Sequence, residues 1–458
     1  MKTVVLILML LTTVSGFAEN AEMASFWVVF SDKSHSIYSI NQPAEFLSDR
    51  AIERRQKQNI PIKENDFPVN LNYLNQLKNQ GAIIKFTSRW FNAAAVACTK
   101  ENVQQIAKLP FVKSVEYVGK HFRNAKTLQQ KKGKPKTIKR AFLNKYGYAK
   151  TQIEMLKGVR LHELGLTGYG QMIAVLDAGF TDVGSSIFFE ESRQKNRLLH
   201  AYDIIESDTD VYESSKHGTQ VLSVMAANIP GVMVGTAPDA IYVCIKTEDI
   251  RGEFRTDECA WVRGLEYADS LGVDVVNSSL GYTIFDDGEM DYQQEDLDGK
   301  TSLTSQAAEV AFSKGMIVVN SAGNEGKNDW KGLAMPADGP NVLAIGAVNQ
   351  DNQKCDFSSI GWVSNRGVKP DLVALGIDVA VVSGEKAIVL SGQGTSYAAP
   401  LVSGLVATLW QAYPYATNQQ IMEAIRKTAN SALHPNQETG FGVPNFSAAF
   451  NYLEMKEK

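Results

Sequence analysis

Three polar residues of this chain stand where an apolar segment meets a run of small residues. Asp177 directly follows the apolar residues 172–176, His217 precedes Gly-Thr and an apolar helical pattern, and Ser396 lies in Gly-Thr-Ser-Tyr-Ala-Ala-Pro. A serine at the start of a buried helix is close to unpaired backbone N–H groups, which stabilise negative charge on its oxygen. A histidine can accept the serine proton, and a carboxylate can fix the tautomer of that histidine. Together the three residue types have the chemistry of nucleophilic attack on a carbonyl group.

Each of these residues also has an ordinary structural role when it is considered alone. Ser396 could cap a helix, Asp177 could belong to a turn, and His217 could be a surface residue at a helix start. Only His217 of the six histidines combines small neighbours with a following apolar helix. The other histidines are His35, His121, His162, His200 and His434. The combination therefore favours catalysis over three unrelated structural roles.

A fourth residue, Asn324, follows the apolar residues 316–319 in the segment Asn-Ser-Ala-Gly-Asn-Glu-Gly. Its side-chain amide could donate an N–H to the anion that forms when a serine attacks a carbonyl. Loss of one such donor typically lowers the rate by about 10²–10³-fold. A lone Asn-Glu-Gly turn would carry no such meaning.

The elements that must position these residues alternate in type after residue 152. Apolar runs predict strands, and patterns of about a dozen residues between them predict helices. The predicted strands are 172–176, 241–245, 273–276, 316–319 and 342–346, and the predicted helices are 218–228, 258–270 and 302–314. Nearly continuous apolar strands alternating with helices are typical of a parallel sheet covered on both faces. Chemistry in such α/β sheets gathers at the carboxyl ends of the strands.

The first part of the chain has a different rhythm and predicts a separate α+β unit of about 100 residues. Its predicted strands are 26–30, 82–86 and 93–97, and its predicted helices are 44–57 and 69–80. Nine Lys or Arg and no acid then follow between Lys120 and Arg140. Such a basic run between two folded units is typical of a solvated linker that proteases can reach.

Composition places the chain among ordinary globular proteins, with 44% hydrophobic and 21% charged residues among 458. A net charge of −4 gives no reason to expect nucleic acid as a partner. Lys2, an apolar run over residues 4–11 and small residues up to Ala18 have the pattern of a secretory signal peptide. The run is too short to span a membrane, so we expect an exported protein, secreted or periplasmic, with no membrane anchor after signal cleavage.

Four cysteines are too few for a disulfide scaffold. If Cys98 leaves with a pro region, the remaining three allow at most one intrachain bridge. Cys244 lies in an apolar strand pattern and is expected to be a small buried residue.

The order of Asp177, His217, Asn324 and Ser396, with the segments around them, resembles that of the subtilisin-like (subtilase) serine proteases. The matching segments are residues 173–179, 217–219, 278–281, 321–326 and 394–400. The resemblance implies a three-layer α/β fold with a mostly parallel sheet, preceded by a small α+β propeptide domain that inhibits the site. It also implies an Asp-His-Ser triad that requires no cofactor.

The same resemblance implies roles for the residues around the triad. Asn324 and the backbone N–H of Ser396 would form the oxyanion hole. Substrate would be bound by Ser279, Leu280, Gly281, Ala322 and Gly323. The first three of these would pair with the substrate backbone as an edge strand does.

One departure from the family pattern is Ala178, since the family usually has Ser or Thr after the catalytic aspartate. We expect backbone groups to orient Asp177 instead. A second unusual segment lies at residues 286–298. It carries seven acids, which are Asp286, Asp287, Glu289, Asp291, Glu295, Asp296 and Asp298. The segment is either a solvated loop or a structural calcium site, and its spacing matches no defined calcium loop, so the metal ligands stay unknown.

The sequence thus predicts a signal peptide at 1–18, a propeptide or inhibitor-like domain at 19–119, a basic linker with the processing site at 120–145, and a catalytic domain at 146–458. The predicted function is that of an exported serine endopeptidase, made as a zymogen, which cleaves protein or peptide substrates. A catalytically silent binding protein on a protease fold is the alternative. A lipase or esterase is disfavoured because Ser396 is not followed by the Gly of a G-x-S-x-G turn.

Overall fold

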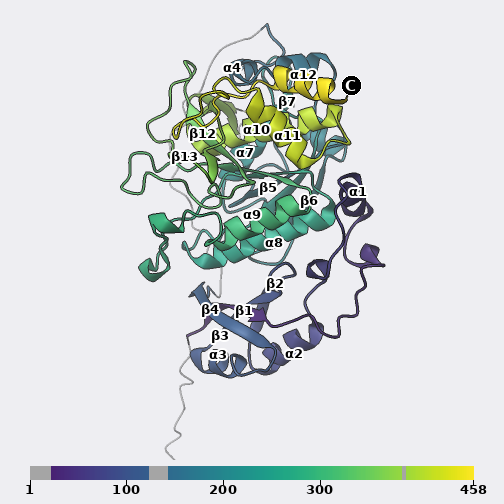
Figure 1. The fold of residues 1–458 in the computed structure, drawn as a ribbon, viewed down its shortest axis with the longest axis vertical. Helices are drawn as coiled ribbons and strands as arrows, with labels where there is room; N and C mark the ends of the chain where they lie inside the picture. The colour runs from purple at the N-terminus through teal and green to yellow at the C-terminus, as the bar shows by residue number, and fades with distance from the viewer. Residues whose placement is uncertain (1–21, 123–142, 384–387, 458) are drawn as a thin grey trace, which may run out of the picture.

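The computed structural model describes residues 22–122, 143–383 and 388–457 of the chain. The expected signal peptide and most of the expected linker lie outside the described residues. We call residues 22–122 the N-terminal unit and residues 143–457 the C-terminal unit (Figure 1). The first has an antiparallel sheet with helices and the second a parallel sheet with helices, which confirms the predicted α+β and α/β architecture.

The C-terminal unit is built on a seven-stranded sheet in the order β15-β12-β11-β10-β5-β9-β6. All neighbouring strands in it are parallel. The strands are β5 (Met172–Asp177), β6 (Leu198–Asp203), β9 (Ile241–Lys246), β10 (Val275–Ser278), β11 (Ile317–Ser321), β12 (Leu343–Val348) and β15 (Leu372–Leu375). The chain fills the β9 side of β5 first and then crosses to β10 on its other side. The carboxyl ends of β5 and β10 therefore border a switch point, where sites of α/β sheets usually lie.

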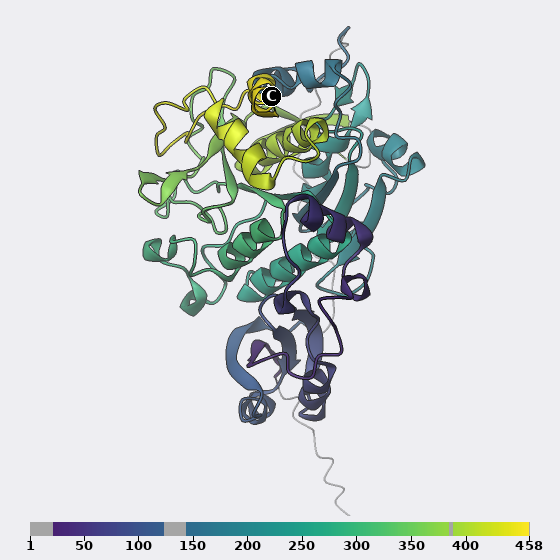
Figure 2. The same ribbon diagram turned by 45° about the vertical axis from the view of Figure 1, so that its right-hand side comes forward.

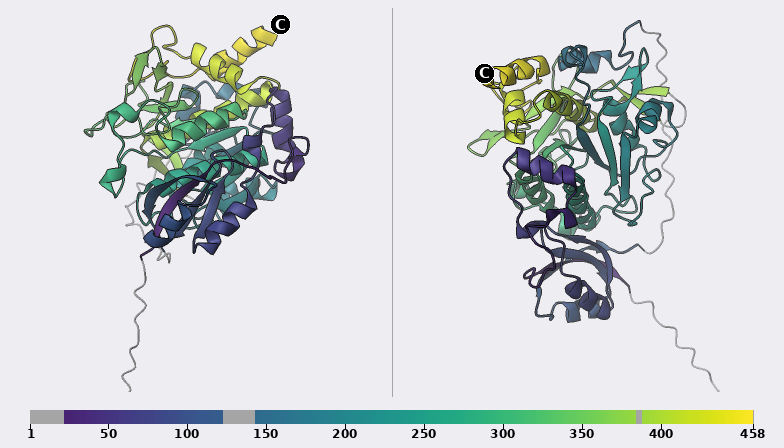
Figure 3. Two further views of the ribbon diagram at one scale, coloured as in Figure 1. Left: turned by 60° about the horizontal axis from the view of Figure 1, so that its bottom comes forward. Right: turned by 90° about the vertical axis from the view of Figure 1, so that its right-hand side faces the viewer.

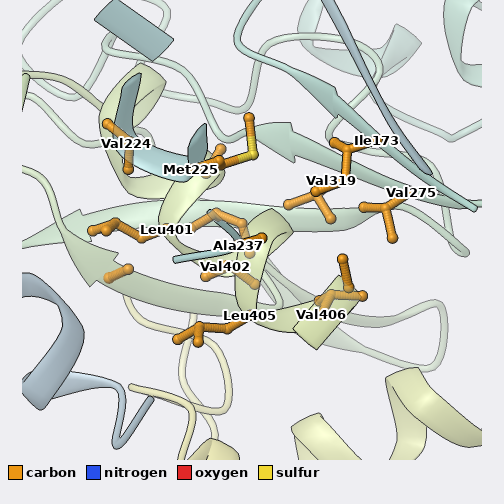
Figure 4. Close-up of a cluster of buried hydrophobic side chains, with 14 of the residues drawn as sticks. Ile173, Val224, Met225, Ala237, Val275, Val319, Leu401, Val402, Leu405 and Val406 are labelled. Carbon is orange, nitrogen blue, oxygen red and sulfur yellow. The ribbon is translucent and has the colours of Figure 1, made fainter. Parts of the chain in front are cut away.

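Helices cover both faces of this sheet. Helices α7 (His217–Ala226) and α10 (Thr395–Ala412) lie on one face, and α8 (Arg255–Leu271) and α9 (Leu303–Ser313) lie on the other. Side chains of β5 alternate between two cores, with Ile173 and Val175 on the α10 side and Ala174 on the α8 side. Figure 4 shows part of the α10 side, where Leu405 and other α10 residues gather near the strand valines. Burial on both faces explains why the strands are apolar throughout.

The N-terminal unit has a four-stranded antiparallel sheet in the order β2-β3-β1-β4. Its strands are β1 (Ala24–Phe30), β2 (Ile83–Ser88), β3 (Ala93–Cys98) and β4 (Val112–Lys120), and its longer helices are α1 (Asp49–Lys57), α2 (Leu71–Asn79) and α3 (Lys100–Ile106). Phe26 and Val28 face a core with α2 and α3, whereas Trp27 points to the opposite face and joins the core around α8. Helices α8 and α9 thus lie between the two sheets (Figure 1).

Helix α1 does not pack on the four-stranded sheet. It lies in the long connection between β1 and α2 and rests against the C-terminal unit (Figures 2 and 3). We call residues 48–58, which are this helix and its two end residues, the arm.

Smaller elements complete the structure. They are the helices α4 (Lys150–Met155), α5 (Val159–Glu163), α6 (Glu190–Gln194), α11 (Asn418–Lys427) and α12 (Phe446–Glu457), the strands β7 (Asn228–Ile229), β8 (Met233–Val234), β13 (Trp362–Ser364), β14 (Gly367–Lys369), β16 (Val379–Ser383) and β17 (Ile388–Gly392), and the 3-10 turns η1 (Pro43–Glu45), η2 (Glu64–Asp66), η3 (Ile187–Phe189), η4 (Gly288–Met290) and η5 (Gln294–Asp296). Across the ranges described above, we find no helix with the length and apolar character that a membrane crossing requires.

All four cysteines are buried and free of disulfide bonds. Burial raises the pKa of the Cys98 thiol to about 11 and that of Cys244 to about 12. These thiols therefore stay protonated at neutral pH, and Cys244 is the small buried residue that its apolar strand predicts.

Candidate active site

Asp177 is the last residue of β5, and its side chain is fully buried at the carboxyl edge of the sheet. The backbone N–H of Ala178 donates to Asp177 Oδ1 over 2.8 Å. This contact is the backbone support that the sequence predicts in place of a neighbouring hydroxyl. A carboxylate held in this way has a fixed direction and keeps its other oxygen available.

His217 is the first residue of α7, and its ring faces that carboxylate. The Nδ1 atom lies 2.9 Å from both carboxylate oxygens of Asp177, and the backbone N–H of His217 donates to Ser215 Oγ over 3.1 Å. Nδ1 must carry a proton to donate to a carboxylate, which leaves the lone pair on Nε2. Burial lowers the pKa of His217, but the charge of Asp177 and the hydrogen bond to it outweigh burial and raise this pKa above its ordinary value. The ring is thus a base whose proton affinity is set by one carboxylate.

Ser396 is the second residue of α10, where the helix begins beside unpaired backbone N–H groups. Gly394 precedes the helix with φ at +146°, a conformation that glycine adopts readily. Ser396 Oγ donates to the carbonyl of Ser279 over 3.3 Å, and Ser279 Oγ donates to the carbonyl of Ser396 over 2.8 Å. The hydroxyl therefore rests on the substrate-side segment and is not hydrogen-bonded to His217 in this structure. Such catalytic contacts often form only in the substrate complex.

Asn324 lies beside the start of α10. Its Oδ1 accepts hydrogen bonds from the backbone N–H of Thr395 over 2.9 Å and from Thr395 Oγ1 over 3.0 Å. Both contacts use the amide oxygen, so the Nδ2 donors point to the other side of this exposed side chain. An anion near Ser396 could therefore accept a hydrogen bond from Asn324.

Comparison with known proteins gives two family matches. The Subtilase family matches residues 168–442, and the family described as Peptidase S8 propeptide domain, Bacteroidota, matches residues 25–136. The first match covers more than half of the chain and includes all four residues described above. The chain belongs to the subtilase family.

Several subtilases are similar to this one over most of their length. Subtilisin NAT from Bacillus subtilis subsp. natto is 28% identical over 384 residues, which are 81% of this chain and 84% of that protein. Subtilisin from Bacillus pumilus is 30% identical over 308 residues, which are 65% of this chain and 97% of that protein. The chain is thus a serine-type endopeptidase with a propeptide domain, and subtilase chemistry requires no cofactor.

A solved structure shares the fold. The MycP3 protease from the type VII (ESX-3) secretion system superposes with a TM-score of 0.50 at 22% identity, over 66% of this chain and 87% of that chain. This similarity supports the three-layer subtilase architecture.

The segment of residues 279–281 continues from β10 at the carboxyl edge of the sheet. Asn320 Nδ2 donates to the carbonyl of Leu280 over 3.0 Å, and Tyr282 pairs with Met335 through both backbone groups. Gly281 is exposed. Among the described residues, no hydrogen bond uses either of its backbone groups. This subtilase therefore has an extended segment whose exposed end can accept another strand.

Ala322 and Gly323 directly precede Asn324 and have few groups that a substrate could contact. Ala322 is fully buried, its N–H donates to Ile345, and its carbonyl accepts from Ala334. Gly323 has φ at +109°, and a Cβ there would meet Ser359 Oγ at 2.7 Å. Ala322 therefore has no free backbone group for a substrate, and Gly323 packs closely against Ser359.

Sequence reasoning missed a buried chain of polar side chains that joins β10 to α10. Ser403 Oγ donates to Asn277 Oδ1 over 2.8 Å, and Asn277 Nδ2 donates to Ser279 Oγ over 3.2 Å. The chain ends at the carbonyl of Ser396 through the Ser279 contact given above. Ser403 lies seven residues after Ser396, two helical turns along α10, and that spacing was the available signal.

Proposed function

We propose that this subtilase is an exported endopeptidase whose nucleophile is Ser396, with His217 as its base. Asp177 is the carboxylate that orients His217 and stabilises its protonated form. The observation that carries the proposal is the pair of 2.9 Å contacts between His217 Nδ1 and Asp177. This geometry leaves Nε2 as the only ring nitrogen able to accept a proton.

In the proposed reaction, an extended peptide pairs with residues 279–281, and Ser396 Oγ turns from the Ser279 carbonyl toward His217 Nε2. His217 takes the hydroxyl proton as Oγ bonds to the scissile carbonyl carbon. Asn324 Nδ2 and the Ser396 N–H donate to the resulting oxyanion. The C–N bond then breaks, and His217 gives its proton to the leaving amine. Water repeats the sequence on the ester and frees Ser396.

The proposal includes production as a zymogen and export. The N-terminal unit would be an intramolecular inhibitor, removed by a cut between Lys120 and Lys145. We keep the proposed boundaries of 1–18, 19–119, 120–145 and 146–458. Export rests on the signal-peptide pattern of the first 18 residues. The sequence left a catalytically silent binding protein as the alternative. The match to a peptidase family disfavours that alternative.

Structural calcium remains part of the proposal only as a stabilising ion. Within residues 286–298, the carboxylates of Asp291, Asp296 and Asp298 accept hydrogen bonds from backbone N–H groups of the same loop, which is the role of turn residues. Within the described ranges, Glu248, Glu253 and Asp257 form the one group of three or more His, Cys, Asp or Glu residues whose ligand atoms all lie within 4.8 Å of one another. Equal melting temperatures with and without a calcium chelator would exclude a structural calcium ion.

The decisive experiment compares the intact masses of the wild type and Ser396→Ala, each expressed with its N-terminal region. We expect the wild type to lose that region and Ser396→Ala to keep it. Ser364→Ala, a change of an exposed serine in β13, is the matched control and should mature normally. Equal trimming of wild type and Ser396→Ala, or peptide hydrolysis by Ser396→Ala, would contradict the proposal.

A further inference from the structure

The arm docks at the amino edge of the parallel sheet, which is the edge opposite the candidate active site. Arg50 Nε donates to the carbonyl of Gly272 over 2.9 Å, and Gln58 Nε2 donates to the carbonyl of Gly315 over 2.8 Å. Gly272 and Gly315 precede β10 and β11. A strand rises about 3.3 Å per residue, so four to six residues of strand separate this edge from the catalytic one. The arm therefore contributes no contact to the triad.

A buried acid is the centre of the docking site. Asp269, in the last turn of α8, has a fully buried side chain and accepts hydrogen bonds from Arg54 over 2.5 Å, Arg55 over 2.8 Å and Arg89 over 2.7 Å. All three arginines belong to the N-terminal unit, and their side chains are almost completely buried as well. Burial alone raises the pKa of Asp269, but the three arginines outweigh burial and lower it. The carboxylate of Asp269 is thus ionised, and the hydrogen bonds given above all come from the N-terminal unit.

Two further polar contacts cross the same interface. Lys314, at the end of α9, forms an ion pair with Asp66, with Nζ 2.7 Å from Oδ1. Glu266 of α8 accepts from the backbone N–H groups of Arg89 and Trp90, each over 3.0 Å. Charged groups of both units therefore neutralise one another, and neither set would be satisfied in this way if the units separated.

The backbone of the C-terminal unit is shaped for close approach of the arm. Gly272 ends α8 with φ at +86°, and a Cβ there would lie 2.6 Å from the backbone N of Ala51. Gly315 has φ at +91°, and a Cβ there would lie 2.7 Å from Gln58 Nε2. The docking surface is therefore complementary to the arm in shape as well as in charge.

We propose that the arm is a second docking element of the N-terminal unit, at the sheet edge opposite the active site, and that it slows the release of that unit once the linker has been cut. Cleavage of the linker changes none of the contacts described above, since the linker contributes to none of them. Two sites joined in one folded unit also bind far more tightly than either does alone. This inference rests on the proposed zymogen function.

The test uses the full chain carrying Ser396→Ala, with a recognition sequence for a site-specific protease inserted between residues 130 and 131. The added protease makes the cut, so the result is independent of the chain's own activity. After the cut and dilution, size-exclusion chromatography at successive times measures how fast the two fragments separate. We expect them to co-elute when the arm is native. In the double variant Arg50→Ala, Arg54→Ala they should separate at least about 100-fold faster, because truncating a buried charge pair acts on dissociation.

Lys57→Ala is the matched control, because Lys57 lies on the same helix and its ion pair is with Glu53 of the arm. It should separate at the wild-type rate. Immediate separation with a native arm, or equal rates for the double variant and the control, would overturn the inference. If the double variant shows no cooperative melt before the cut, the single variant Arg50→Ala decides the test, because this side chain is 33% exposed. We expect its fragments to separate about tenfold faster. A failure of self-processing in the wild type would count against the proposed function only.

Discussion

The two edges of the seven-stranded sheet differ in how their polar groups are used. At the carboxyl edge, the hydroxyl of Ser396 donates one long hydrogen bond of 3.3 Å, and the side chain of His217 is 33% exposed. At the amino edge, Asp269 is fully buried and accepts from three arginines. The groups that the proposed function assigns to catalysis thus keep unused hydrogen-bonding capacity and access to the solvent. Asp269, which helps to hold the two units together, is closed to the solvent, and both of its carboxylate oxygens already accept hydrogen bonds.

The two ends of α8 also differ, in the direction in which the pKa of a buried acid is shifted. Glu258, in its first turn, lies buried near the carboxyl edge with the hydroxyl of Tyr292 2.8 Å away, and burial raises its pKa to about 7. Asp269, in the last turn, has its pKa lowered by arginines. Burial is similar at both positions. Glu258 has a cationic neighbour in Arg255 at 3.9 Å, whereas Asp269 has three arginines within hydrogen-bond distance, and this difference decides the direction of each pKa shift.

The largest effect is expected at the carboxyl edge. Asp177→Asn should lower kcat by about 10⁴-fold, because the amide no longer fixes the tautomer of His217 or stabilises its charge. Activity is lost as the pH falls through the pKa of His217, which the Asp177 charge raises. The acid limb of the kcat–pH profile should therefore move to lower pH in the variant. Asp210→Asn, at an exposed position, is the control, and an unmoved acid limb would contradict this role of Asp177.

At the amino edge, Asp269→Asn should reduce the free energy of unfolding of the uncut chain by about 3–5 kcal/mol, because three buried arginines lose their counter-charge. Urea unfolding of the Ser396→Ala chain measures this loss. The same substitution in mature enzyme, from which the arginines have left, should have a much smaller effect. Equal losses in the two forms would show that Asp269 does not act through the interface.

Asn324→Ala should lower kcat by about 10²–10³-fold with little change in KM, because its amide would act on the oxyanion and not on the bound substrate. Asn324→Asp keeps the size and the oxygen that accepts from Thr395, but it has no N–H donor. Both variants should therefore lose kcat alike. An active Asn324→Asp would assign the residue a purely structural role.

The smallest of these effects concerns Glu258. Its pKa is about 7 in the folded chain against 4.5 for an ordinary glutamate, so the folded state prefers the protonated carboxyl. Stability from this group is present below pH 4.5 and is lost as the pH rises through 7, by at most about 3 kcal/mol. Glu258→Gln should remove this pH dependence in urea unfolding at pH 5 and 8. The exposed Glu163→Gln should leave it in place.

The places of the candidate catalytic residues in the fold could be predicted from the sequence because their signals are local. Asp177, His217 and Ser396 each lie in a short segment where an apolar strand or helix meets small residues. Parallel topology then brings the segments to one edge, whatever their distance along the chain. Strand β6 was not predicted, since its residues are half exposed at the border of the sheet and lack an apolar run.

The amino edge could not be predicted in this way. The arm has the Arg, Glu and Gln residues that are typical of a solvent-exposed helix, and its partner Asp269 lies 215 residues after Arg54. No local pattern distinguishes an arginine in water from one that will meet a buried acid of another unit. The acids of residues 286–298 were ambiguous for a similar reason, since carboxylates that cap turns and carboxylates that bind ions have the same sequence signature.

Gly272 connects folding and maturation in one residue. It ends α8 in a left-handed conformation, which affects the stability of both the zymogen and the mature enzyme. It also leaves room for Ala51, which affects stability only while the arm is present. An alanine there would weaken the mature enzyme by roughly 1 kcal/mol and the zymogen by more. The difference between the two losses isolates the steric contribution of the arm, so a single backbone position reports how strongly the precursor depends on a contact that the final enzyme discards.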